Sequence, residues 1–117
     1  MARSQPELRR GRLVWATVRD ARGNTKERPL IILTPTDAIH ADEPLVAMAV
    51  TTSFTDPPPP DCVPLPWHPQ GRVITKLRKR SAAVLSWIVE TKAGDITSLY
   101  GDVPVKLMEE ILRKLDA

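Results

Sequence analysis

Apolar residues in this chain come in short runs, and prolines, glycines or polar loops separate one run from the next. Runs of roughly four to eight residues with such boundaries are typical of β-strands, because most helices are longer. The prolines inside residues 62–66 restrict that segment to a sheet edge, and residues 96–99 form either a further short strand or a turn. The pattern predicts strands at residues 12–18, 30–33, 45–52, 62–66, 72–77 and 82–90.

The C-terminal residues follow a different pattern. Gly101–Pro104 precede an amphipathic segment, and proline is well suited to the first turn of a helix. We predict a helix over residues 104–116, with Asp102 capping it or complementing its dipole. Its apolar face comprises Leu107, Met108, Ile111, Leu112 and Leu115.

A chain of 117 residues has room for one domain. Short strands leave unpaired edges unless the sheet curls or closes, so we predict a mainly β fold, a small barrel with the C-terminal helix packed on it. The domain is expected to span residues 11–117, and the polar, charged residues 1–10 to form a flexible basic arm.

Charged residues are segregated along the chain. Residues 1–28 carry eight basic and three acidic side chains, residues 29–71 carry five acids and no Lys or Arg, and residues 72–80 carry five bases and no acid. If the fold brings the two basic segments together, they form a positive surface that attracts phosphate backbones. The alternative, that each basic run is only a solvated face, stays open on charge alone.

The residue types disfavour several classes of protein. Cys62 is the only cysteine, so no internal disulfide can form, and no basic or His pattern beside it favours a nucleophile. His40 and His68 are too few for a zinc site, and we expect no metal and no other cofactor. No apolar stretch is long enough to span a bilayer, and residues 1–10 lack an apolar signal core. We therefore expect a soluble, cytoplasmic protein without membrane contact.

Two further features allow two interpretations each. Pro57–Pro60 form either a stiff loop or a docking site for a proline-reading partner. Trp67 and Trp87 can stack on unpaired bases or pack in the core. Trp87 lies within an apolar segment, which favours the core, whereas Trp67 lies in a proline-rich turn and is the better candidate for exposure.

Segments spread along most of the chain resemble the MazF/PemK-like toxins of type II toxin–antitoxin systems. The shared features are a glycine-led first strand, an Arg-Pro pair entering an apolar strand, a threonine closing the third strand, and a basic pair before a serine. Their joint order and spacing, from Gly11 to Leu115, carry the resemblance. The similar segments are Gly11–Trp15, Glu27–Leu33, Ala49–Ser53, Thr75–Val84 followed by Trp87, and Gly101–Pro104 with the C-terminal helix.

This resemblance implies an SH3-like barrel that pairs as a homodimer and cuts single-stranded RNA without a metal. The 2′-hydroxyl would attack the adjacent phosphate, leaving a cyclic phosphate and a 5′-hydroxyl, and a cognate antitoxin peptide would occupy the RNA groove. By position, Arg28 and Thr51 correspond to the catalytic pair, and Asp20–Glu27 to a mobile loop beside the site. The other predicted RNA-binding residues are Arg22, Lys26, Thr52, Ser53, Trp67, Lys76, Arg78, Lys79 and Arg80.

The residue types at these positions suit phosphodiester cleavage. The planar guanidinium of Arg28 can form two parallel hydrogen bonds to phosphate oxygens, and the Thr51 hydroxyl can donate another. Arginine stays protonated and is a poor general base, so another group must accept the 2′-proton, or the step runs without a dedicated base. His68 has the right pKa range, but nothing in the sequence places it near Arg28.

Two positions depart from the family pattern. Glu27 stands where a small residue is common, and it either pairs with Arg28 or points to the other side of its strand. Lys76 stands where glycine is common, and it either adds a phosphate contact or indicates a changed groove. With cleavage lost, the barrel would be a non-catalytic module that binds RNA or DNA through residues 72–80 and the basic arm. A partner peptide, held in the dimer groove or at Pro57–Pro60, is the other alternative.

Overall fold

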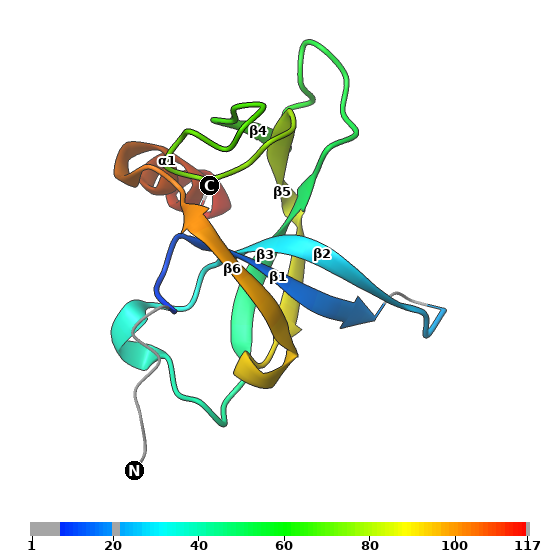
Figure 1. Ribbon diagram of the computed structural model, residues 1–117. Coiled ribbons are helices and arrows are strands. Elements are labelled where there is room, and N and C mark those ends of the chain that lie inside the picture. Colours follow the sequence, from blue (N-terminus) through cyan, green and yellow to red (C-terminus); the bar gives the residue numbers. More distant parts are fainter. Residues whose placement is uncertain (1–7, 20–21, 117) are drawn as a thin grey trace.

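The computed structural model describes residues 8–19 and 22–116, which form one antiparallel sheet and a C-terminal helix (Figure 1). The sheet has the strand order β4-β5-β3-β2-β1-β6. The elements are β1 (Arg12–Arg19), β2 (Thr25–Ile32), the 3-10 helix η1 (Thr36–Ala38), β3 (Leu45–Thr51), β4 (Cys62–Leu65), β5 (Ser81–Thr91), the 3-10 helix η2 (Ala93–Asp95), β6 (Ile96–Asp102) and α1 (Val105–Asp116).

The mainly β fold with one C-terminal helix is confirmed, and β4 lies at a sheet edge as its prolines require. The start of β2 differs from the prediction, because the strand begins at Thr25 instead of Leu30. The polar residues 25–29 pair with β1 from Thr25↔Arg19 to Pro29↔Trp15. The expected loop Asp20–Glu27 is therefore partly strand, while Asp20 and Ala21 lie outside the described residues.

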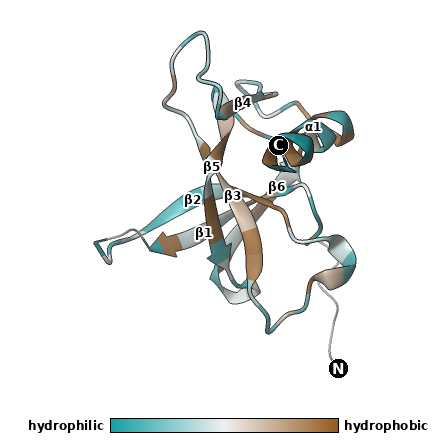
Figure 2. Ribbon diagram, turned by 180° about the vertical axis from the view of Figure 1, so that it is seen from behind, coloured by the Kyte–Doolittle hydropathy of each residue, from teal (hydrophilic) through white to brown (hydrophobic). Residues whose placement is uncertain are grey.

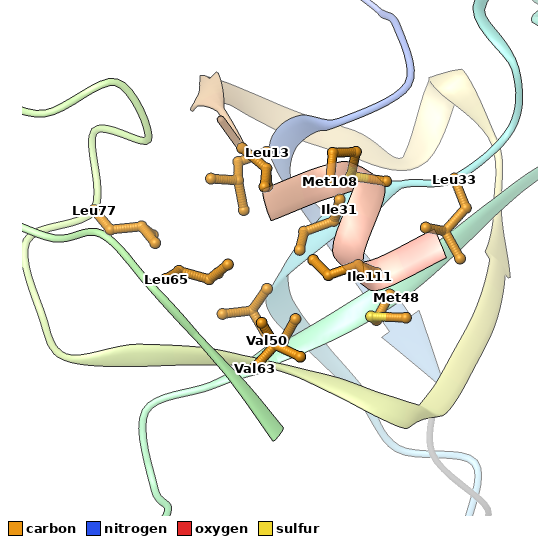
Figure 3. Close-up of a cluster of buried hydrophobic side chains, with 12 residues drawn as sticks. Leu13, Ile31, Leu33, Met48, Val50, Val63, Leu65, Leu77, Met108 and Ile111 are labelled. Atoms are coloured by element: carbon orange, nitrogen blue, oxygen red, sulfur yellow. The ribbon is translucent and has the colours of Figure 1, made fainter. Parts of the chain in front are cut away.

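Side chains pack on both faces of the sheet. Leu13, Ile31 and Met48 belong to a cluster that includes Met108 and Ile111 of α1 (Figure 3). Because neighbouring residues in a strand point to opposite faces, Val14, Leu30 and Ile32 lie in a second cluster on the other face. The apolar face predicted for the helix is thus the face that packs on the sheet. The projecting tip of the β1–β2 hairpin is hydrophilic (Figure 2).

The sheet curls but does not close. β4 and β6 are its outer strands and do not pair with each other in the described chain, so the predicted closed barrel is not confirmed. The loop of residues 66–80 bridges the gap instead, because Gly101 N donates to Thr75 O at 3.1 Å and Asp102 N donates to Ile74 O at 3.0 Å. The approach is so close that a Cβ on Gly101 would lie 1.8 Å from the Ile74 oxygen.

The strand predicted at residues 72–77 is wrong, because this part of the loop is a series of turns. Gly71 has φ +70° and Lys76 has φ +65°, and a β-strand needs negative φ at every residue. The apolar and β-branched residues that suggested a strand are anchored by turn contacts. Thr75 is buried, and its Oγ1 donates to Pro66 O at 2.7 Å and accepts from Leu77 N at 3.2 Å.

The predicted flexible arm ends earlier than expected. Its residues 1–7 lie outside the described residues, but Leu8 is 5% exposed and packs in the second cluster. Arg9 makes a bidentate ion pair with Asp102, Nε to Oδ1 at 2.9 Å and Nη2 to Oδ2 at 2.8 Å. The Asp102 carboxylate therefore joins β6 to the N-terminal segment. Pro104 precedes the helix, and its carbonyl accepts from Met108 N at 2.9 Å.

No helix in the described residues has the length and hydrophobicity that crossing a bilayer requires. The longest one, α1, has 12 residues and carries Arg113 and Lys114 in its last turn. These cations suit the negative end of the helix dipole.

Candidate functional site

Thr51 is the last residue of β3, and Arg28 lies within the neighbouring strand β2. The two strands pair from Ile32↔Ala47 to Leu30↔Ala49. Arg28 and Thr51 each lie two residues beyond the last of these pairs, Leu30↔Ala49, so the register brings both to the part of the sheet where the two strands stop pairing. Two apolar strands with fixed pairing thus bring together residues that are far apart in the sequence.

A cavity of about 480 Å³ opens at this end of the sheet. Both Arg28 and Thr51 line it, together with the cations Lys26, Arg78 and Lys79. The wall is completed by residues from β1, β2, β3, β5, β6 and the loop of residues 66–80, namely Trp15, Glu27, Pro29, Val50, Thr52, Ser53, Leu77, Ser81 and Tyr100. Four cationic side chains and one carboxylate line the cavity, so its field favours an anionic ligand.

The guanidinium of Arg28 is held by an aromatic ring. Its Cζ lies 4.6 Å from the ring centroid of Trp87, within the range of a cation–π contact. Trp87 is half-buried and packs against the second cluster, on the face of β2 that also carries Leu30 and Ile32. Trp87 itself does not line the cavity, whereas Arg28 does. Trp87 is therefore partly a core residue, as predicted, and partly a platform for Arg28.

Glu27 does not pair with Arg28. Its Oε1 accepts a short hydrogen bond from the Thr97 hydroxyl of β6, and Thr97 Oγ1 also lies 3.2 Å from Trp15 O. Within residues 8–19 and 22–116, no ion pair joins Arg28 to a carboxylate. The Glu27 carboxylate therefore points away from Arg28, which is the second of the two predicted possibilities. Glu27 does not neutralise the charge of the Arg28 guanidinium.

The hydroxyl of Thr51 takes part in the turn that follows β3. Thr51 Oγ1 accepts from Ser53 N at 3.0 Å and donates to Ser53 O at 3.3 Å. The first bond fixes the position of the oxygen. The second is long and therefore weak, so the hydroxyl hydrogen can be redirected to a ligand in the cavity at small cost.

The other predicted RNA-binding residues fall into separate groups. Lys76 lines a neighbouring cavity, and Arg22 is exposed near the tip of the β1–β2 hairpin. Trp67 is 45% exposed, as predicted, but it lines a third hollow with Arg80, away from Arg28. The predicted residues that line the cavity with Arg28 and Thr51 are Lys26, Thr52, Ser53, Arg78 and Lys79.

Arg80 is engaged in holding its own loop. Its Cζ lies 3.8 Å from the ring centroid of Phe54, and its guanidinium donates to Phe54 O at 3.0 Å and Thr55 O at 3.2 Å. These contacts join the start of β5 to the segment that follows β3. Arg80 thus fixes the loop after Thr51. Its predicted contact with RNA would come in addition to this role.

Sequence reasoning missed the aromatic wall of the cavity. Trp15 and Tyr100 come from the neighbouring strands β1 and β6, and their ring centroids are 6.0 Å apart with planes tilted by 53°. Aromatic faces of this kind can pack against the bases of an unpaired strand. The only signal in the sequence was their rarity, since the chain has three tryptophans and one tyrosine.

Neither His68 nor Cys62 belongs to the cavity. His68 Nδ1 accepts from Gln70 N at 3.0 Å and Arg72 N at 3.4 Å, so it organises the turn after Trp67. Burial raises the pKa of the Cys62 thiol, and the neighbouring Asp61 carboxylate raises it further. The sulfur is thus protonated at neutral pH, which disfavours a nucleophile. In the described part of the chain, no three His, Cys, Asp or Glu side chains come together as a metal site would require.

Comparison with known proteins relates this chain to others by structure only. No protein-family model matches the sequence, and no curated protein does. MazF from Deinococcus radiodurans superposes with a TM-score of 0.70 at 19% identity, covering 92% of each chain. An endoribonuclease from mycobacterial species gives 0.66 at 16% identity, covering 93% of this chain and 88% of the other. The chain therefore has the fold of MazF.

Proposed function

We propose that this chain is a toxin endoribonuclease of a type II toxin–antitoxin system, which cleaves single-stranded RNA by a metal-independent mechanism. The observation that carries the proposal is that Arg28 and Thr51 line one cavity with Lys26, Arg78 and Lys79. The shared MazF fold, and the sequence resemblance on which this pair was chosen, support the same function.

The chemistry follows from these side chains. The 2′-oxygen of a ribose forms a bond to the adjacent phosphorus, the bond from phosphorus to the 5′-oxygen of the next nucleotide breaks, and a 2′,3′-cyclic phosphate and a 5′-hydroxyl remain. Negative charge grows on the non-bridging oxygens in the transition state. Arg28 and the Thr51 hydroxyl donate to those oxygens, and the surrounding Lys and Arg side chains compensate the charge.

Proton transfer has no dedicated base in this proposal. No histidine lines the cavity, and Arg28 remains protonated. Glu27, the one carboxylate in the lining, is held by Thr97 on the side toward β6. The 2′-proton is therefore lost to solvent, and the 5′-oxygen takes its proton from solvent.

The proposed partners are a cognate antitoxin peptide and a second copy of the chain. A structure of MazE with MazF from Deinococcus radiodurans has a TM-score of 0.70 at 18% identity, covering 92% of this chain and 91% of the other. The mycobacterial endoribonuclease in complex with its cognate antitoxin gives 0.62 at 16% identity, covering 93% and 89%. A cationic cavity suits acidic segments of such a peptide. We place the protein in the cytoplasm, where its RNA substrate is found.

We further propose that the fold is an SH3-like barrel whose closure is completed by a loop. The loop of residues 66–80 reaches from β4 to β6. The carbonyl oxygens of Ile74 and Thr75 in this loop accept hydrogen bonds from backbone N–H groups of β6. These bonds protect the end of the β6 edge, as strand pairing would in a closed barrel. They also hold Arg78 and Lys79 over the end of β3.

One observation favours a second function, a module that binds RNA without cutting it. The Arg28 guanidinium lies against Trp87, a residue that does not line the cavity. If bound RNA does not draw it to the phosphate, the cavity holds the strand but does not stabilise the transition state. This alternative predicts salt-dependent RNA binding without products.

The chemistry of the cut ends tests the proposal. Purified protein is incubated with pooled single-stranded RNA in the presence of a metal chelator, and the 5′ and 3′ ends of the fragments are mapped. We expect 5′-hydroxyl and 2′,3′-cyclic phosphate ends. A 5′-phosphate end, or a requirement for added divalent metal, would contradict the mechanism.

A further inference from the structure

We propose that a second cationic cavity beside the candidate site is a phosphate subsite, which binds an RNA phosphate outside the scissile position. The cavity has a volume of about 680 Å³ and is lined by eight residues. Four of them are cationic and none is acidic. The lining residues are Arg12, Gln70, Gly71, Arg72, Lys76, Arg78, Leu99 and Tyr100. The part of the inference that concerns RNA rests on the proposed function.

The two cavities share a wall. Arg78 and Tyr100 line both of them, so a strand that leaves the Arg28–Thr51 cavity along Arg78 enters the second cavity directly. Arg72 and Lys76 lie beyond that shared wall and do not line the first cavity. A nucleic acid strand carries a phosphate at every nucleotide, so a ligand that spans both cavities places one phosphate in each.

The backbone around the second cavity is built to present these cations. Lys76 has φ +65° and is the one non-glycine residue of the described chain with a positive φ. Residues with side chains rarely adopt this conformation, and it is found mostly where function or surrounding contacts require it. The family resemblance places a glycine here, which would adopt the same turn without strain. This chain instead has a cation at the rim of the cavity.

A network of hydrogen bonds keeps the two turns together. Gly71 has φ +70°, a conformation that residues with side chains rarely adopt, and a Cβ there would lie 3.2 Å from the Lys76 carbonyl oxygen, a tight contact. His68 joins the turns, because its N donates to Leu77 O at 2.9 Å and its Nδ1 accepts from Arg72 N at 3.4 Å. Arg72 and Lys76 are thereby presented side by side on an ordered rim.

Arg12 and Tyr100 close the cavity on the side of the sheet. Arg12 Nε donates to Tyr100 O at 2.7 Å, which holds the guanidinium at the wall. Leu99, 39% exposed, and the Tyr100 ring add apolar surface beside the cations. The combination of several cations with a small apolar wall suits a sugar–phosphate segment, because Arg and Lys bind phosphate oxygens and the apolar surface contacts sugar or base.

The test measures binding of an RNA that cannot be cut. The probes are fluorescently labelled oligonucleotides with 2′-O-methyl groups, and their lengths run from a dinucleotide with one phosphate to a decanucleotide. Each probe is titrated with the protein in the oligomeric state in which it purifies. The variant Arg72→Ala/Lys76→Gly removes two cations and relieves the positive φ, so it is expected to fold. Arg113→Ala, which removes one exposed cation from α1, is the matched control.

We expect the double variant to bind the decanucleotide about tenfold more weakly than the wild-type protein. The slope of log K against log salt should fall by about 0.7 for each RNA phosphate that the variant no longer neutralises. Binding of the dinucleotide, which fills only the first cavity, should change by less than about twofold. The control should match the wild type at every length.

Three results would overturn the subsite. The first is equal affinity of the double variant and the wild type for the decanucleotide. The second is a weakening of RNA binding by the double variant that is equal at all lengths. The third is a double variant that loses binding to an acidic peptide while its RNA binding is intact. The last would assign the cavity to a protein partner. Cleavage is measured separately, in the assay that maps the RNA ends. A protein that yields no products there but binds with the predicted length dependence here would refute the nuclease and leave the subsite standing.

Discussion

The Arg28 guanidinium rests on the Trp87 indole, with Cζ 4.6 Å from the ring centroid. Trp87 lies in the irregular part of β5, where the pairing with β3 shifts between Met48↔Ile88 and Val50↔Ala83. The Trp87 ring reaches a cation of β2, although β3 lies between β2 and β5 in the sheet. The contact limits the movement of the guanidinium.

The first prediction is that Trp87 positions Arg28. Replacing Trp87 with Leu removes the cation–π contact, worth about 0.5–2 kcal/mol, and lets the guanidinium move. We expect kcat for RNA cleavage to fall by about tenfold, with KM little changed. Trp87→Phe keeps an aromatic face and should restore most of the rate. Equal kcat values for the Leu and Phe variants, at equal thermal stability, would show that the ring has no positioning role.

The second prediction concerns Thr51. Thr51→Val keeps the shape of the side chain but removes its hydroxyl, while Thr51→Ser keeps the donor. Losing one preorganised donor to a developing oxyanion costs about 10²–10³-fold in rate. We therefore expect that loss for the valine variant and a change below about fivefold for the serine variant in single-turnover cleavage. A valine variant as active as the serine variant would remove Thr51 from the mechanism.

The third prediction concerns proton transfer. Glu27→Gln preserves an acceptor for the Thr97 hydroxyl but cannot accept a proton as a carboxylate does. Because the proposed reaction uses no dedicated base, the cleavage rate should stay within about threefold, whereas loss of a general base costs about 10²–10⁴-fold. The rate should also keep rising with pH above neutrality. A large loss in the Gln variant would identify Glu27 as the base.

The fourth prediction tests the loop that bridges β4 and β6. Gly101→Ala places a Cβ 1.8 Å from Ile74 O, so the loop must move away from β6. Overpacking of this kind costs about 1–3 kcal/mol, and we expect a loss in that range in urea unfolding. Gly94→Ala is the matched control, since nothing lies within 4 Å of its added Cβ. Similar stabilities for the two variants would show that the bridge is dispensable.

Local sequence patterns were sufficient to predict those elements whose structure depends mainly on their own residues. The periodicity of α1 identified Met108 and Ile111 as core residues, and the apolar run of β3 placed Thr51 at the end of its strand. The resemblance to a family selected those two residues, and the strand register explains why both line one cavity.

Features that depend on distant contacts could not be predicted from local patterns. Thr25–Pro29 are mostly polar, yet they form strand because they pair with β1. Residues 72–77 have the composition of a strand, but Lys76 takes a positive φ and Ile74 bonds to β6. The contact between Trp87 and Arg28 joins two strands that are not neighbours in the sheet, and the sequence of β5 contains no signal for it.

The central claim is that Arg28 stabilises the transition state of RNA cleavage, and the most direct test is the cleavage rate of Arg28→Ala. Single-turnover rates are measured on one defined RNA for the wild type, Arg28→Ala and Arg113→Ala, all with verified folding. We predict a loss of about 10³-fold for Arg28→Ala and no change for Arg113→Ala. A wild-type protein that does not cut, or an Arg28→Ala variant within about threefold of the wild-type rate, would contradict the claim.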